Sequence, residues 1–99
     1  MAGAEIGETI REKREAILRI AAAHGATQVR LIGSVARGDA RPDSDIDFLV
    51  TWREDTSILD HAALKLELES LLGREVDIAS DGWVRSPIRE AVYRDAVPV

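Results

Sequence analysis

The sequence predicts a small α/β domain, in which helices and strands alternate in the order α-β-α-β-α-β-α. Hydrophobic residues recur at helical spacing in two long segments, and they alternate with polar residues in three short ones. Ser, Gly and Pro mark the boundaries between these segments. The 99 residues, 45% of them hydrophobic, suffice for one core, so we expect residues 1–99 to form a single domain.

The first predicted helix spans residues 8–24. Thr9 and Glu12 have the spacing of a capping box, which would place the helix start at this point. Gly25 is a typical stop signal. We expect the apolar side chains of this helix to share one face: Ile10, Ile17, Leu18 and Ala21.

A strand, a turn and a short helix are predicted next. Residues 28–32 alternate polar and apolar side chains, as a strand does, and they lead directly into Gly33 and Ser34. Residues 34–38 allow about a turn and a half of helix. Residues 39–44 include a proline and are expected to form a loop.

The second strand is predicted at residues 45–51 and is followed by a long helix. Ser57 and Asp60 have capping-box spacing, and Gly73 ends the pattern. This gives a helix of about four turns. We expect one apolar face on it: Ile58, Leu59, Ala62, Leu66 and Leu72.

The last two predicted elements are a strand at residues 74–79 and a closing helix. Val76 and Ile78 alternate with acidic residues in the strand. Ser86 followed by Pro87 is a strong helix start, and the helix should end near Asp95.

Composition and charge exclude several classes of protein. The formal net charge of −5 is the wrong sign for binding nucleic acid through its phosphates, so no direct nucleic-acid contact is expected. The chain has no cysteine for disulfides or thiolate metal sites. No apolar run approaches the roughly 20 residues of a membrane-spanning helix, and none near the first residue would serve as a signal peptide. We therefore expect a cytoplasmic protein with no membrane partner.

Three aspartates on predicted strands are the strongest sign of chemistry. Residues two apart in a strand project from one face, so Asp45 and Asp47 present their carboxylates side by side. Asp77 lies between apolar neighbours on the next strand along the chain. If the two strands are adjacent, three carboxylates converge, and such a cluster can hold two divalent ions for phosphoryl or nucleotidyl transfer. We expect Mg²⁺ there.

A candidate phosphate site precedes these aspartates. Gly33 lets the main chain approach a ligand, and Ser34 lies where a strand turns into a helix whose free N–H groups face an anion. Arg37 and Arg41 are near enough in the sequence to neutralise a triphosphate.

The segment GSVARGDARPDSDIDFLV resembles the minimal nucleotidyltransferases, relatives of DNA polymerase β whose signature is Gly-Ser, ten residues, then Asp-x-Asp. The resemblance extends over nearly the whole chain and implies a mixed β-sheet flanked by helices. It implies that Gly33 and Ser34 hold the triphosphate of ATP, and that Asp45 and Asp47 hold Mg²⁺. Asp77 would complete the acidic triad and help to activate an acceptor hydroxyl.

The resemblance also suggests a role. Minimal nucleotidyltransferases of this kind are commonly antitoxins that attach AMP to a tyrosine of a HEPN-domain ribonuclease toxin, with which a hetero-oligomer is expected. Two alternatives stay open at this point. One is an antitoxin that masks the toxin by binding alone, and the other is a nucleotidyltransferase acting on a small molecule.

Overall fold

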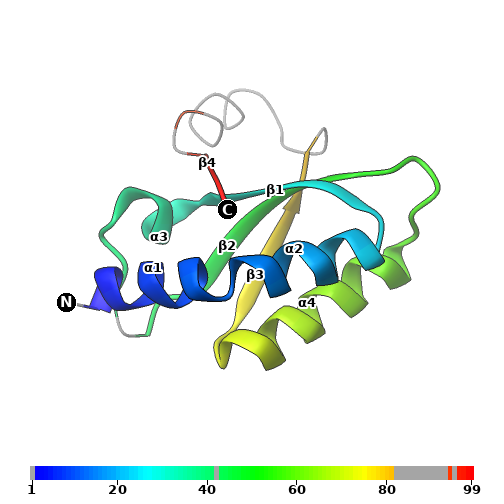
Figure 1. The fold of residues 1–99 in the computed structure, drawn as a ribbon. Helices are drawn as coiled ribbons and strands as arrows, with labels where there is room; N and C mark the ends of the chain where they lie inside the picture. Colours follow the sequence, from blue (N-terminus) through cyan, green and yellow to red (C-terminus); the bar gives the residue numbers. More distant parts are fainter. Residues whose placement is uncertain (1, 42, 82–93, 95) are drawn as a thin grey trace.

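A computed structural model describes residues 2–41, 43–81, 94 and 96–99, and the structural statements below concern these residues. Figure 1 shows the elements in chain order. They are α1 (Ala2–Glu12), α2 (Arg14–Ala23), β1 (Ala26–Ile32), α3 (Gly33–Arg37), β2 (Ile46–Trp52), α4 (Ile58–Leu72), β3 (Val76–Ser80) and β4 (Val97–Pro98).

The strands form one four-stranded mixed sheet in the order β3-β2-β1-β4. β1 runs antiparallel to both β2 and β4, whereas β2 and β3 are parallel. The parallel pair is possible because α4 carries the chain back along the sheet between them. This arrangement confirms the predicted α/β class and mixed sheet, although the two-residue β4 was not expected. In the described part of the chain, no helix has the length and apolar character needed to cross a membrane.

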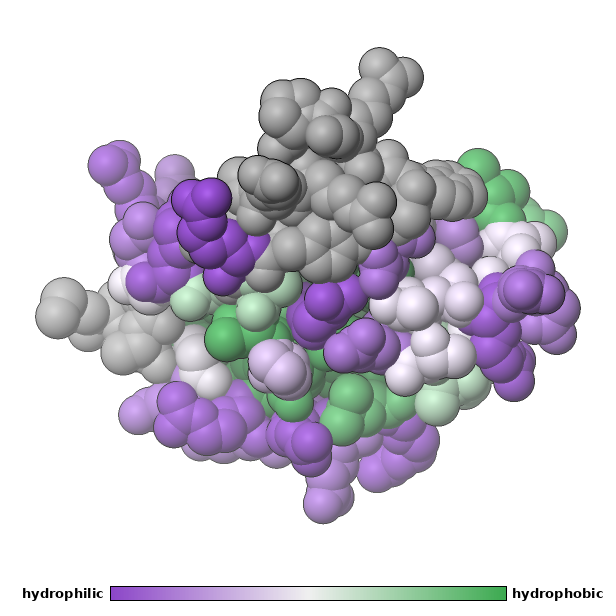
Figure 2. Space-filling view, turned by 90° about the horizontal axis from the view of Figure 1, so that it is seen from above, coloured by the Kyte–Doolittle hydropathy of each residue, from purple (hydrophilic) through white to green (hydrophobic). Residues whose placement is uncertain are grey.

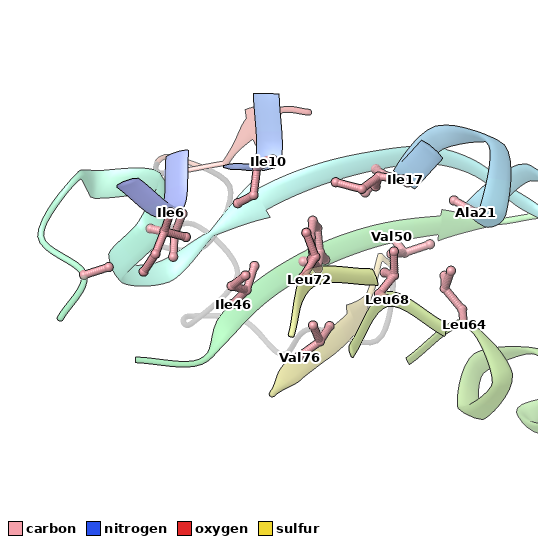
Figure 3. Packing of buried hydrophobic residues seen from close by; sticks show 14 residues of the cluster. Ile6, Ile10, Ile17, Ala21, Ile46, Val50, Leu64, Leu68, Leu72 and Val76 are labelled. Atoms are coloured by element: carbon pink, nitrogen blue, oxygen red, sulfur yellow. The ribbon is translucent and has the colours of Figure 1, made fainter. Parts of the chain in front are cut away.

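The hydrophobic core lies on one face of the sheet, beneath α1, α2 and α4 (Figures 1 and 3). Ile46, Phe48 and Val50 alternate along β2 and are almost fully buried against this layer. From the helices, Ile17 and Leu68 reach the same cluster and are also fully buried. Each such side chain contributes about 1.5–3 kcal/mol on burial. The residues between those of β2, Asp47 among them, therefore face the other side of the sheet.

The first predicted helix has a different start. α1 begins at Ala2, so Thr9 lies inside the helix and the predicted capping box is wrong. Lys13 separates α1 from α2, yet its N–H still donates to Thr9 O at 3.0 Å. The box spacing misled because Thr and Glu at that separation also fit a helix interior, and α1 continues through Gly3 and Gly7 ahead of Thr9. The predicted buried positions Ile10, Ile17 and Ala21 are confirmed.

α4 packs with a different face from the predicted one. Ile58 and Leu59 are 76% exposed and Leu66 is 65% exposed, so the expected apolar face is wrong except at Leu72. Figure 2 shows hydrophobic surface at the end of the molecule that carries the β2–α4 connection. The helix has large apolar residues on both sides, and spacing alone could not tell which side meets the sheet. The buried side chains are Leu64, Leu68 and Leu72.

Other boundaries agree more closely. The Asp60 carboxylate accepts a hydrogen bond from the Ser57 N–H at 2.9 Å, which confirms the predicted start of α4. The second and third strands begin one and two residues later than predicted, at Ile46 and Val76. The predicted closing helix, residues 86–95, lies outside the described residues apart from Arg94.

Candidate functional site

The strand register brings two of the predicted aspartates together. Asp47 of β2 pairs with Ile32 on one side and with Asp77 of β3 on the other. Both carboxylates project from the face of the sheet opposite the core, on strands about 4.8 Å apart. The adjacency of the two strands, which the sequence left open, therefore places Asp47 and Asp77 side by side.

Asp45 immediately precedes β2 and acts on the same carboxylate. The pKa of Asp47 is raised above its ordinary value, chiefly by partial burial and then by the negative charges of Asp77 and Asp45. The positive charge of Arg37 opposes this shift. Three like charges and one cation thus share one electrostatic environment, which is the arrangement expected of a site that binds cations.

Gly33 closes this site from the side of β1. Its φ of +73° lies in the left-handed region that favours glycine. A Cβ at this position would stand 2.5 Å from Asp47 Oδ2, which is closer than any real contact allows. The main-chain conformation therefore favours glycine, and a Cβ here would also force the Asp47 carboxylate to move away. Ser34 follows directly, in the first turn of α3.

The two predicted phosphate-binding arginines differ in their surroundings. Arg37 is the last residue of α3, and its Nε lies 3.3 Å from Asp39 Oδ2. Its positive charge also acts on the Asp47 carboxylate, whose pKa it lowers. Arg41 is exposed in the loop that leads to β2, where its N–H donates to Ser44 Oγ at 2.8 Å. No described contact joins Arg41 to the aspartates, so its predicted part in phosphate binding stays a prediction.

The donor set fits a divalent metal ion. Among the described residues, no three Asp, Glu or His side chains stand close enough together to hold one ion in their present positions. However, carboxylate oxygens are the ligands that Mg²⁺ prefers, and a cation between them would remove the repulsion that raises the pKa of Asp47. The kind of side chain present therefore suits such an ion.

A fourth aspartate on the same face of the sheet provides a contrast. Asp81, just beyond β3, accepts hydrogen bonds from Arg30 Nη2 and Thr51 Oγ1, each at 3.0 Å. Its charge is balanced, and the three partners tie β1, β2 and the end of β3 together. Asp47 is instead surrounded mainly by like charge. The contrast makes the Asp47 end of the sheet the candidate site.

Sequence reasoning missed two residues beside the site, Lys65 and Glu69 of α4. Lys65 Nζ donates to Val76 O at 2.7 Å, and Glu69 Oε2 accepts from the Val76 N–H at 3.1 Å. Both therefore hold the main chain next to Asp77. The only signal in the sequence is an i, i+4 pair of opposite charges, which is common on exposed helices.

Comparison with known proteins shows which family this sequence is similar to. Residues 10–97 match the family described as nucleotidyltransferase domain. A protein of Methanocaldococcus jannaschii named as a protein adenylyltransferase is 37% identical over 90 residues, which are 91% of this chain and 97% of that protein. The protein adenylyltransferase MntA of Thermococcus cleftensis is 39% identical over 75 residues, 76% of each chain.

Solved structures share the fold. One described as a minimal nucleotidyltransferase is 54% identical, with a TM-score of 0.85 over 94% of this chain and 95% of that chain. A Shewanella oneidensis complex of an MNT antitoxin with a tri-AMPylated HEPN toxin gives a TM-score of 0.67 at 17% identity, covering 89% of this chain and 69% of that one. At this identity the second likeness concerns the fold alone.

Proposed function

Because the chain belongs to the nucleotidyltransferase domain family, we propose that it transfers AMP from ATP to a tyrosine hydroxyl of a HEPN-domain toxin and is the antitoxin of that toxin. The observation that carries the proposal is the pairing of Asp47 with Asp77 across β2 and β3, with Asp45 beside them and Gly33 against Asp47. Residues 1–99 act in it as one domain.

Each site residue has a part in the proposed reaction. Asp45, Asp47 and Asp77 would hold Mg²⁺, expected as two ions, and the metal would supply charge stabilisation for the transfer. Gly33 and Ser34 receive the triphosphate, with Arg37 and Arg41 neutralising its charge. These four residues thereby fix the α-phosphate in front of the carboxylates.

The bond changes balance without a further reactant. The acceptor oxygen forms a bond to the α-phosphorus of ATP, and the bond from that phosphorus to the pyrophosphate oxygen breaks. Asp77 takes the proton of the acceptor hydroxyl, as a carboxylate within reach of it can. The products are AMP esterified to the acceptor and pyrophosphate.

The proposed partner is supported by what the related proteins are. The relatives above carry the name protein adenylyltransferase, and one solved structure of this fold is a toxin-antitoxin with AMP-PNP. A toxin that brings its own tyrosine also supplies the acceptor side of the site, so a hetero-oligomer with the toxin forms during the reaction. Since ATP is the donor, we place the protein in the cytoplasm.

A growth assay tests this function. A candidate HEPN-domain toxin is expressed in cells with the wild-type chain or with the double variant Asp45→Asn, Asp47→Asn. We expect growth to be restored only by the wild type, because the variant cannot hold the metal. Full protection by a folded double variant would contradict the proposal and would favour an antitoxin that masks the toxin by binding alone.

A further inference from the structure

The strand that carries Asp77 is an outer strand of the sheet, and its free edge lies beside α4. The Ile46 N–H of β2 donates to Glu75 O at 3.0 Å. In a strand, the main-chain groups of successive residues point to opposite edges. The groups of Asp77 therefore face β2, like those of Glu75, and the N–H and C=O of Val76 face the free edge.

Two side chains of α4 bind both of these groups of Val76. Lys65 Nζ lies 2.7 Å from Val76 O, and Glu69 Oε2 lies 3.1 Å from Val76 N. Lys65 Nζ and Glu69 Oε2 are themselves 3.0 Å apart, so the three residues form a closed ring of hydrogen bonds. The Val76 side chain is fully buried in the core. Val76 is thus held by its side chain and by both of its polar main-chain groups.

The electrostatics of the ring agree with its geometry. The Val76 N–H, followed by Lys65, holds the pKa of Glu69 below its ordinary value. The hydrogen bond to Glu69 raises the pKa of Lys65, and the charges of Asp77 and Glu75 add to that effect. Lys65 therefore stays a cation and Glu69 stays an anion at neutral pH, and the Lys65 charge is close enough to act on Asp77.

We propose that Lys65 and Glu69 are positioning residues for Asp77, because they hold the Val76 main chain so that the Asp77 carboxylate stays opposite Asp47. The inference rests on the proposed function, in which Asp77 binds the metal. Asp77 shares a peptide group with Val76, so a shift of the outer strand would move its carboxylate directly. A displacement of about 1 Å in a catalytic site is enough to lower a rate about 100-fold.

Substitutions in the 99-residue chain test this role. Glu69→Ala and Lys65→Met each open the ring, whereas Lys65→Arg keeps a donor and a positive charge. Glu67→Ala is the matched control, since it removes the same charge from an exposed residue of the same helix, whose carboxylate pairs with His24 at the end of α2 and not with the β3 main chain. Asp77→Asn reports on the proposed site itself. Binding of Mn²⁺ in the presence of a non-hydrolysable ATP analogue is measured by calorimetry, at a temperature at which circular dichroism shows each variant folded.

We expect Glu69→Ala and Lys65→Met to weaken Mn²⁺ binding by about 10- to 100-fold, the usual effect of losing a group that orients a metal ligand. Lys65→Arg and Glu67→Ala should stay within about twofold of the wild type. If Glu69→Ala does not fold, Glu69→Gln replaces it, because its amide oxygen still accepts from the Val76 N–H while the attraction to Lys65 is lost. A smaller weakening of Mn²⁺ binding than for Lys65→Met is expected for this variant, because the bond to Val76 N–H is kept.

Amide exchange followed by NMR gives a second readout. The Val76 N–H should exchange faster in Glu69→Ala than in Glu67→Ala, whatever the protein does with nucleotides. Unchanged Mn²⁺ binding in Glu69→Ala and Lys65→Met, together with a loss in Asp77→Asn, would overturn the positioning role and leave the proposed function standing. Unchanged binding in Asp77→Asn would overturn both.

Discussion

At the level of single residues, Gly33 shows how closely β1 approaches the aspartates. We predict that Gly33→Ala lowers the free energy of unfolding by about 1–2 kcal/mol for the left-handed conformation and by about 1–3 kcal/mol more for the contact with Asp47. Gly38→Ala is the control, because Gly38 has a φ of +82° and nothing within 4 Å of the added Cβ. Urea unfolding of both variants measures the difference, and equal losses would contradict the close approach.

Asp47 illustrates a conflict between stability and function. Its raised pKa means that the charged carboxylate is disfavoured in the folded, metal-free protein. We predict that Asp47→Asn raises the free energy of unfolding at pH 7 in EDTA, by up to about 1 kcal/mol after screening by solvent. Because the folded-state pKa of Asp47 lies above the unfolded value, the wild type loses stability only at pH values where this carboxyl is charged. The gain from Asp47→Asn should therefore vanish below about pH 3.9, where the carboxyl is neutral in both the folded and the unfolded state.

A second measurement on Asp47→Asn is the binding of metal and nucleotide. The substitution should abolish binding of Mn²⁺ with an ATP analogue, although the protein is more stable. A variant that is destabilised at neutral pH in EDTA would show that Asp47 is not held against like charge. It would remove the electrostatic basis of the site.

At the level of elements, the ring between α4 and β3 predicts a dependence on pH. Glu69 has a lowered pKa in the folded state, so its contribution is present above its unfolded pKa, near 4.5, and is lost as the pH falls through the folded value. The wild type should therefore be more stable than Glu69→Gln at pH 7, and this difference should shrink as the pH is lowered toward 3. Urea unfolding at both pH values measures it, and a difference independent of pH would contradict the ring.

The orientation of α4 can be tested with two leucines that lie two residues apart. Leu68 is fully buried and Leu66 is 65% exposed. We predict that Leu68→Ala lowers the free energy of unfolding by about 2–5 kcal/mol, whereas Leu66→Ala changes it by less than about 0.5 kcal/mol. Chemical denaturation compares them directly. Similar effects of the two substitutions would mean that the helix packs with another face.

These elements also show what the sequence can and cannot reveal. The two-residue period of a strand was enough to predict that Asp47 projects away from Ile46 and Phe48, and a glycine before a short helix indicated the approach of the main chain. Asp45 lies just before β2, so its place on the same face stays a prediction. Which strands are neighbours depends on contacts far apart in the chain, so the pairing of Asp47 with Asp77 needed the structure. Leucines on both sides of α4 likewise left its buried face undecided.

For the whole molecule, hydrogen bonds from side chains to distant main-chain groups are the feature that is hardest to predict from the sequence. Lys65 and Glu69 appear in it as an ordinary exposed pair, and only the fold shows that they bind the strand that carries Asp77. The same fold turns Phe48 and Val50 toward the core beneath the helices and Asp47 and Asp77 toward the other face of the sheet. The central claim is that the protein transfers AMP to a partner protein at the site that these carboxylates form.

The intact mass of the partner toxin tests that claim most directly. The toxin is incubated with ATP, Mg²⁺ and this protein, and its mass spectrum is recorded before and after the reaction. The account predicts that the toxin gains the mass of one or more AMP units with the wild type, and that it gains none with EDTA or with the double variant Asp45→Asn, Asp47→Asn. An unmodified toxin with the wild type, or the same adduct with the double variant, would contradict it.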